Sequence, residues 1–520
     1  MAVMISCVLR FLRILSRPIC PASPNPELNG SGQKVTFLLL LHILSGLFVF
    51  ISVNNSEEYR SDNQSENQIG TWAIVMVFVM VGITSLVVLF IRGYQNKLKV
   101  SDTALTRLSD PSLNLRIIFL WIFGLFVIVH VLIDIAINIH CMETLEVGRV
   151  REAISVLSNI TLLIYLLLQL SFISYYRNST FVQNIVVNIS SIAVLVANFA
   201  IWFNSVMSSI NVLDINANTT IPNYNNESYC FQTSSIQVVL GNKLRPFVLP
   251  PRLEFCILAS IFIISFWTWP LELQQENNIY QNINSANDDH RASLEIRHQI
   301  IGPHVFISVL GILLNIPVLF SHLMLAFVFN WKQEDVYFVM HLRQCVSSVC
   351  NIIAIYICSY HLVRRFDNCW RPSRLTNNEH ILIMSSSAMV AYFVFGVLTA
   401  LHSPFPVYMF LISRIVALLE TFLQTHFLLK LKRYKTEGKT SLLISSTGIF
   451  LMIKNLIFWF VYSYNAYHHL TTLDLVLVDT AGWSYMNQVL GPVKTFYRFF
   501  SGMISYSVYH KFKSNHCNQM

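Results

Sequence analysis

The same pair of uncharged amides occurs twice within apolar segments of this chain. Gln169 is followed 29 residues later by Asn198, and Gln424 is followed 31 residues later by Asn455. In both cases a tryptophan follows the Asn by four residues. An amide inside lipid is costly unless it is partnered, so such residues usually face a bundle interior or a polar path. The recurrence of the pair indicates an internal duplication, which is common among membrane transport proteins.

The duplicated amides have two interpretations. They could simply hold helices together, because an interhelical amide hydrogen bond contributes about 1–2 kcal/mol in model peptides. They could instead form a functional site, because contacts that only join helices do not need to recur at matched positions. The duplication favours the functional interpretation.

Ionisable residues also lie within apolar segments. His130 precedes Asp134 by one helical turn, and Glu420 precedes Gln424 by the same interval. A charge at the bilayer centre costs roughly 2.5–3.5 kcal/mol on insertion scales, so His130, Asp134 and Glu420 are candidate intramembrane titratable residues. The His130–Asp134 pair could equally be a structural contact.

Other ionisable residues have a second interpretation. Glu254, Lys454 and Arg498 could lie near a membrane interface, where long side chains reach water and avoid most of the cost. His140, at the outer end of a predicted span, and His468 and His469, in a predicted outer loop, are candidates for sensing external acid, since imidazole titrates near about pH 6.5. A solvated histidine is also commonly inert.

Composition excludes a soluble protein. The chain has 520 residues, of which 54% are hydrophobic and 12% are charged, whereas soluble domains carry about 25% charged residues. The net charge of +8 is spread over short loops, so we expect no nucleic-acid partner. The sequence contains no phosphate-binding loop, H-E-x-x-H, G-x-S-x-G or C-x-x-C motif. We therefore expect no enzyme activity, no cofactor and no metal site.

Apolar runs of about 20 residues predict membrane-spanning helices. Twelve such runs predict an all-α polytopic membrane protein with two structurally similar six-helix halves. The first six are Val35–Val53, Trp72–Ile91, Ile117–Ile139, Ala153–Tyr176, Phe181–Met207 and Leu253–Leu271. The second six are Val305–Phe329, Cys345–Leu362, Ile381–Leu401, Val407–Leu429, Leu442–Tyr462 and Trp483–Tyr509.

Loop charges predict the orientation. The basic segments Arg92–Lys99, Arg364–Arg374 and Lys430–Lys439 each follow an even-numbered span, which places them and both termini in the cytosol. The predicted division of the chain is a cytosolic tail (1–33), a first half (34–273), a cytosolic linker (274–300), a second half (301–511) and a cytosolic tail (512–520).

The outward loops carry two further features. They contain glycosylation acceptors at Asn63, Asn218 and Asn226. Cys141 and Cys230 also fall on this side, where they could form a disulfide or remain two free thiols.

Short motifs along the chain resemble one family. The segment Gly491–Ser501, which reads GPVKTFYRFFS, resembles the closing signature P-x-x-I-F-Y-R-F-H-S of the otopetrin family of proton channels. Another segment, Lys454–Trp459, resembles the C-N-L-S-L-W segment of that family. The other similar segments, in the family's order, are Leu168–Phe172, Asn198–Trp202, Pro250–Phe255, Arg364–Asp367 and Leu418–Leu428.

This resemblance implies a plasma-membrane channel that admits protons when the outside is acidic. It implies a homodimer of twelve-helix subunits in membrane lipid, with a sterol as one candidate lipid. Each half of a subunit is expected to hold a Gln–Asn–Tyr cluster on the proton pathway. The residues at these positions are Gln169, Asn198 and Phe255 in the first half, and Gln424, Asn455 and Tyr497 in the second.

Two positions depart from the family pattern. Phe255 lacks the phenol hydroxyl of the first cluster, and Phe500 replaces the histidine expected to face Glu254 at the interface between the halves. Two alternatives to a proton channel therefore remain. One is a proton-coupled transporter for a small solute, although Pro317 in the seventh span has no counterpart in the first. The other is a non-conducting subunit or scaffold.

Overall fold

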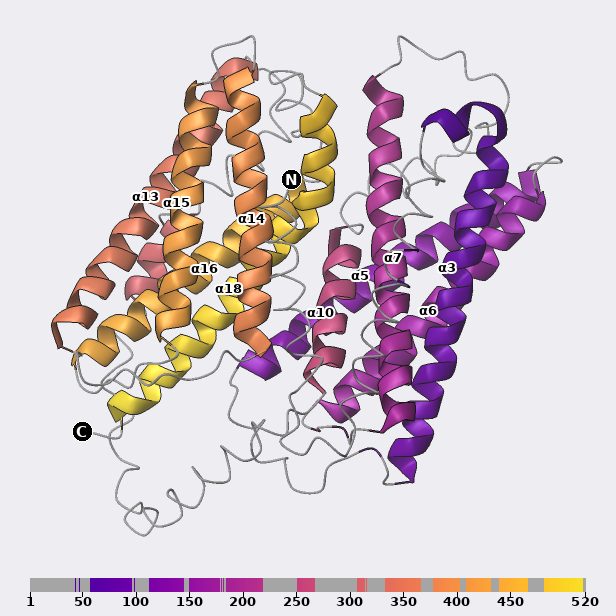
Figure 1. Cartoon of the computed structure of the whole chain (residues 1–520), viewed down its shortest axis with the longest axis horizontal. Coiled ribbons are helices and arrows are strands. Elements are labelled where there is room, and N and C mark those ends of the chain that lie inside the picture. The colour runs from indigo at the N-terminus through magenta and orange to yellow at the C-terminus, as the bar shows by residue number, and fades with distance from the viewer. Residues whose placement is uncertain are drawn as a thin grey trace, which may run out of the picture. The chain divides into compact units, whose positions relative to one another are not determined.

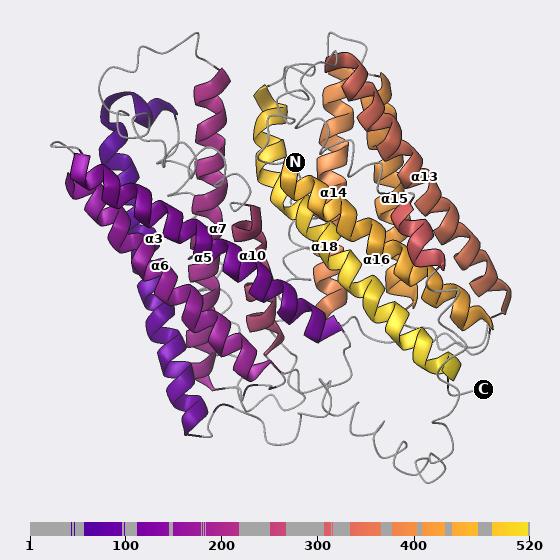
Figure 2. The ribbon, with the colours of Figure 1, turned by 180° about the vertical axis from the view of Figure 1, so that it is seen from behind.

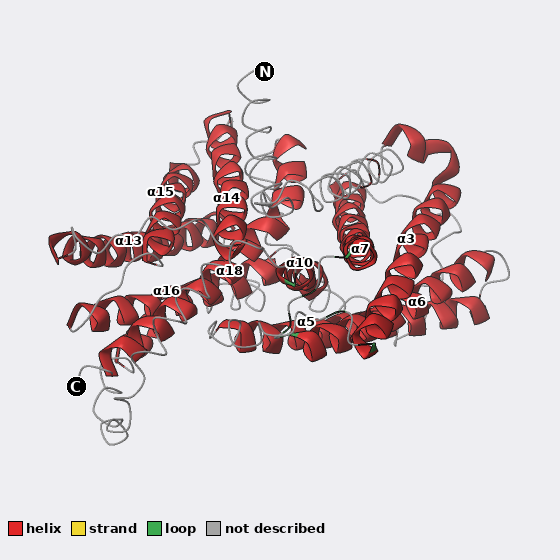
Figure 3. Cartoon of the chain, turned by 60° about the horizontal axis from the view of Figure 1, so that its bottom comes forward, coloured by secondary structure: helices red, strands yellow, loops and turns green. Residues whose placement is uncertain are grey.

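A computed structural model of the chain describes ten long helices and a few short flanking segments. Each long element is an α-helix, and Figure 3 shows no strand among the described residues. The described residues are 43, 46, 57–95, 98, 112–144, 149–177, 179, 181, 184–217, 250–266, 306–313, 315, 333–365, 377–402, 408–431, 439–465 and 481–517.

The chain divides into two compact units. The first unit comprises residues 1–109 and 116–285, and the second comprises residues 110–115 and 286–520. The helices of the first unit are α3 (Glu57–Tyr94), α5 (Ser112–Thr144), α6 (Arg149–Tyr176), α7 (Ile185–Ala217) and α10 (Pro250–Ser265). The helices of the second unit are α13 (Gln333–Arg365), α14 (Asn377–His402), α15 (Tyr408–Leu431), α16 (Lys439–Asn465) and α18 (Ala481–Cys517).

Each unit is a helical bundle (Figure 1). In the first unit α7 packs against α3 and α10, and α3 also packs against α6. In the second unit α14 packs against α15 and α18, and α13 packs against α15. The most extensive contact in this unit joins α16 and α18, which lie side by side in Figures 1 and 2.

The polarity of these bundles is that of a membrane protein. Large apolar side chains point outward, as Leu125, Leu157 and Phe422 do with more than half of their surface exposed. Polar and charged side chains such as Gln424 and Arg498 are fully buried instead. Eight described helices are long and apolar enough to cross a membrane. The chain is therefore an all-helical polytopic membrane protein.

Eight of the twelve predicted spans coincide with these helices. Most residues of the predicted spans Val35–Val53 and Val305–Phe329 lie outside the described residues. The sixth predicted span corresponds to α10, which has 16 residues. The twelfth corresponds to α18, whose 37 residues include Pro492 and several basic side chains and are less apolar.

Two glycines allow close helix packing. A Cβ atom at Gly82 of α3 would lie 2.8 Å from the ring of Tyr165 and 2.9 Å from Cβ of Ala197. A Cβ atom at Gly448 of α16 would lie 3.1 Å from the Ser505 carbonyl oxygen and 3.2 Å from the Tyr509 backbone nitrogen of α18. Small residues commonly allow backbones to approach in this way in membranes.

Two outward-loop predictions bear on described residues. The prediction that Asn63 lies in a loop was wrong, because α3 begins at Glu57 and includes it. The part of α3 before Trp72 is polar, and the apolar part of the helix begins at Trp72. Cys141, at the end of α5, is disulfide-bonded. Cys230, Asn218 and Asn226 lie outside the described residues.

Candidate functional site

The second unit contains a fully buried polar cluster built by four helices. α13 contributes Asn351, α15 contributes Glu420 and Gln424, α16 contributes Lys454 and Asn455, and α18 contributes Arg498 and Ser501. The side chains of these seven residues have no significant solvent exposure. Helical spacing places Glu420 beside Gln424 on one face of α15, so a single helix face presents both a carboxylate and an amide.

One carboxylate oxygen organises the charged part of this cluster. Oε1 of Glu420 accepts hydrogen bonds from Nζ of Lys454, Nη1 of Arg498 and Nδ2 of Asn351, each at 2.8 Å. Charge-assisted hydrogen bonds of this length are about twice as strong as neutral ones. Three helices are thus joined to α15 through one atom.

Hydrogen bonds join the charged part of the cluster to its amide side chains. Nη1 of Arg498 also donates to Oδ1 of Asn455 at 3.2 Å. Nε2 of Gln424 donates to Oδ1 of Asn455 at 3.2 Å and to the Ser501 hydroxyl at 3.1 Å. Asn351 closes the network by donating to Oε1 of Gln424 at 3.0 Å. Carboxylate, guanidinium and amides therefore form one continuous hydrogen-bonded network.

Tyr497 lies beside this network on α18. Its hydroxyl is 2.9 Å from the Thr425 hydroxyl and 3.5 Å from the Thr421 carbonyl oxygen, both on α15. The phenol is fully buried. The structure therefore brings Gln424 and Asn455 into direct contact, with Tyr497 bonded to the adjacent turn of α15.

The interfacial interpretation of Lys454 and Arg498 was wrong. Both side chains have 0% exposure and pair with Glu420 in the bundle interior. Glu254 is also buried, on α10 just after its first turn. An intramembrane cation can remain buried when a carboxylate and several acceptors surround it, whereas snorkelling serves cations without such partners.

The first unit has a smaller cluster around Asn198. The hydroxyl of Tyr165 lies 2.9 Å from Oδ1 of Asn198 and 3.1 Å from the Val194 carbonyl oxygen. Gln169 lies one turn beyond Tyr165 on α6 and is fully buried. Within the described residues, neither amide atom of Gln169 forms a hydrogen bond. The structure thus pairs Asn198 with a phenol rather than with Gln169.

Tyr165 supplies the first unit with a phenol that the sequence analysis did not assign. Phe255 is completely buried and brings no hydroxyl. Tyr165 precedes Gln169 by four residues, just as Glu420 precedes Gln424. This shared spacing was a signal for its position, but a tyrosine within an apolar run resembles an ordinary core residue.

We expect Tyr165→Phe to destabilise the protein by about 1–3 kcal/mol, because it leaves Oδ1 of the buried Asn198 without its donor. The measurement is thermal unfolding of the purified protein in detergent. Tyr175→Phe is the matched control, since Tyr175 is on the same helix and 70% exposed. Equal melting temperatures for the two variants would contradict this account of Asn198.

The predicted partner positions Glu254 and Phe500 belong to different units. Phe500 is buried on α18 and stacks on Phe496 with ring centroids 5.6 Å apart. A phenyl ring offers no hydrogen-bond donor, so Phe500 contributes apolar packing to the second unit.

The remaining ionisable candidates are on α5 or lie outside the described residues. Nδ1 of His130 is 3.4 Å from Oδ2 of Asp134, so the two form the expected pair on α5. His140 is half-buried near the end of the same helix. His468 and His469 lie outside the described residues. No group of three or more His, Cys, Asp or Glu side chains suited to a metal occurs in the described part of the chain.

Asn351 and Ser501 were not identified from the sequence. Asn351 is an amide within the predicted span Cys345–Leu362, so the argument applied to Gln424 could have found it. Ser501 carried no such signal, because a serine in a membrane helix commonly bonds to its own backbone.

Comparisons with known proteins identify one family. A search of curated proteins found no match. The sequence model of the otopetrin family matches residues 207–499, more than half of the chain. The matched region includes the second-unit residues Glu420, Gln424, Lys454, Asn455 and Arg498, and it excludes Gln169 and Asn198. This chain is a member of the otopetrin family, a family of channels.

Proposed function

We propose that this protein is a proton-selective channel that opens to external acid. The observation that carries the proposal is the continuous buried network from Lys454 through Glu420, Arg498 and Asn455 to Gln424. Protons move along hydrogen bonds of side chains and water, so they do not need a wide pore. Larger cations would require rings of acids or carbonyl groups, whereas this network contains one carboxylate.

The test is whole-cell recording of the expressed protein, with the bath stepped from about pH 7.4 to about pH 5 and no sodium or potassium gradient. A proton channel gives an inward current whose reversal potential shifts by about 59 mV per pH unit, the slope for one transferred charge. Surface labelling of the same cells shows that the protein was delivered. Protein at the cell surface without a current, or a reversal potential that does not shift with bath pH, would contradict the proposal.

A second proton route is proposed in the first unit, through Tyr165, Asn198 and Gln169. It is supported by the buried hydrogen bond between Tyr165 and Asn198. The presence of Tyr165 leads us to expect that Phe255→Tyr raises the current or leaves it unchanged. In this proposal the His130–Asp134 pair on α5 is the intramembrane ionisable site of the first unit, and His140, His468 and His469 respond to external acid.

The finer architecture is also a proposal. It consists of twelve spans in two similar six-helix halves (34–273 and 301–511), a cytosolic linker (274–300), cytosolic tails and a plasma-membrane homodimer with glycosylated outer loops. Epitope tags at both termini that stain only after permeabilisation, and cross-linking of two differently tagged copies, would support it. Staining of intact cells would overturn the orientation.

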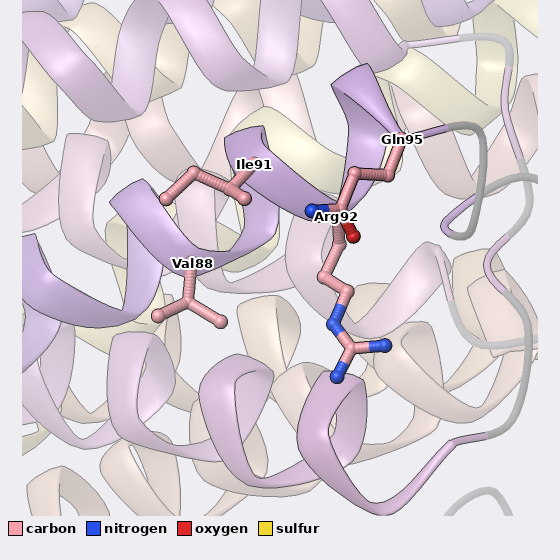
Figure 4. Close-up of a pocket in the computed structure, with 4 residues that line it drawn as sticks. All are labelled: Val88, Ile91, Arg92 and Gln95. Carbon is pink, nitrogen blue, oxygen red and sulfur yellow. The ribbon is translucent and has the colours of Figure 1, made fainter.

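We propose membrane lipid as a partner at the end of α3. Val88, Ile91, Arg92 and Gln95 line a hollow of about 260 Å³ (Figure 4). Val88 and Ile91 are exposed apolar side chains, and Arg92 is in the last turn of the helix. Apolar surface beside a cation suits either the acyl chain of a lipid with an anionic head group or the rings of a sterol. Native mass spectrometry should show less retained lipid in Arg92→Gln, and equal retention would count against this site.

A further inference from the structure

The charged cluster of the second unit has one positive charge too many. Lys454 and Arg498 both bond to the same oxygen of Glu420, at 2.8 Å each, and all three side chains are fully buried. A fully ionised trio therefore carries a net charge of +1. An excess charge in a low-dielectric interior is unfavourable, and this favours the loss of a proton from one of the two cations.

Of these two cations, only Lys454 can remove the excess charge by losing a proton. A guanidinium does not lose its proton in proteins, whereas a buried lysine readily becomes neutral. Among the described residues, the charge interactions named for Lys454 are with Glu420 from α15, Arg498 from α18 and Cys350 from α13. Burial is the strongest influence against the charge on Lys454; Glu420 favours this charge, and Arg498 opposes it less strongly.

The contacts of Lys454 suit a neutral amine as well as an ammonium. Nζ lies 2.8 Å from Oε1 of Glu420 and 3.2 Å from the Ser347 carbonyl oxygen. These two acceptors satisfy the two N–H groups of a neutral amine and leave its lone pair available. Its third described neighbour is the ring of Phe458, with the centroid 5.2 Å away, which suits the additional N–H of the charged form. Both protonation states therefore have partners.

Lys454 also joins two parts of the polar interior. On one side, Glu420 links it to Arg498 and then to the amide pair. On the other side, Nζ donates to the backbone carbonyl oxygen of Ser347, whose side-chain hydroxyl separately donates to Oδ1 of Asn315 at 2.6 Å. Because a backbone carbonyl oxygen cannot relay a proton, a proton that Nζ gains or loses must be exchanged with water.

We propose that Lys454 is the proton-exchanging residue of the second unit. The lone pair on Nζ accepts a proton from a hydronium ion, which becomes water. The ammonium then gives one of its three protons to another water molecule, which restores the amine and leaves no net change in the protein. This inference rests on the proposed proton-channel function and names the group on which the proton resides.

The test compares three substitutions by current and by its pH profile. Lys454→Arg keeps the charge but cannot release a proton, so we expect roughly a tenfold loss of current, equivalent to a barrier raised by about 1.4 kcal/mol. Lys454→Gln removes the titratable group, and we expect a similar loss. Lys454→His restores exchange with its pH profile moved to the acid side, because imidazole has an ordinary pKa of about 6.5 compared with about 10.4 for lysine.

Lys494→Arg is the matched control. Lys494 is on α18 with its ammonium over the rings of Tyr392 and Tyr462, at 4.1 and 4.4 Å from their centroids. We expect this variant to keep the parental current and pH profile. Surface labelling of every variant separates loss of exchange from loss of folding, and if Arg is not accommodated at position 454, the His and Gln variants decide.

The outcomes separate this inference from the function on which it rests. A parental pH profile in Lys454→Arg, or an undiminished current in Lys454→Gln, would overturn proton exchange at Lys454 and leave the channel proposal standing. A silent parent at the cell surface would overturn the channel proposal and the exchange role with it.

Discussion

Replacing Glu420 with glutamine is expected to destabilise the second unit by about 3–5 kcal/mol, the usual cost of leaving a buried charge without its partner. Arg498 would then be a buried cation without its carboxylate, and Nζ of Lys454 would lose the same partner. The measurement is thermal unfolding in detergent, followed by size-exclusion chromatography of the heated sample. We expect little folded protein to survive at temperatures that the parent tolerates.

A neutral variant provides the control for this prediction. Glu420→Gln combined with Lys454→Met and Arg498→Met removes all three charges while keeping similar side-chain volumes. Buried ion clusters replaced in this way commonly lose no stability. Recovery of the melting temperature in the triple variant would assign the loss to uncompensated charge, and a parental melting temperature in the single variant would refute the account.

The second large effect is expected from the amide pair. Gln424→Ala and Asn455→Ala should each lower the proton current about tenfold, which corresponds to a barrier raised by about 1.4 kcal/mol. Each substitution removes a bridge of the network, since Gln424 joins Asn351, Asn455 and Ser501. The measurement is the acid-evoked current normalised to surface protein.

Gln344→Ala is the matched control for the amide variants. Gln344 is also a glutamine of the second unit, and its amide donates to the hydroxyl of Tyr462 at 3.1 Å rather than to a residue of the network. We expect it to keep the parental current. If all three alanine variants conduct equally well, the amide pair does not lie on the proton path.

Sequence reasoning succeeded where a property depends on one segment. The length and apolarity of a run decide whether it spans a membrane, so eight helices were predicted close to where they occur. The order of short motifs identified the otopetrin family, which the family match confirmed. Both predictions required only local information.

It failed where a property depends on partners from distant segments. Glu420, Lys454 and Arg498 are on three helices, and nothing in the local sequence states that one oxygen receives both cations. The sequence of an apolar run does not distinguish a cation that extends to the membrane interface from one that pairs with a buried carboxylate. Tyr165 was missed for the same reason, since only its distance to Asn198 distinguishes it from a core aromatic residue.

The close approach at Gly448 has a mechanical consequence. Because α18 backbone atoms lie 3.1–3.2 Å from the position that a Cβ at Gly448 would take, α16 and α18 pack backbone to backbone there. We therefore expect α16 and α18 to move together, with Lys454, Asn455 and Arg498 keeping their positions relative to one another. We expect any opening motion within this unit to displace α13 or α15 relative to α16 and α18, which would change the contacts of Glu420 and Gln424 first.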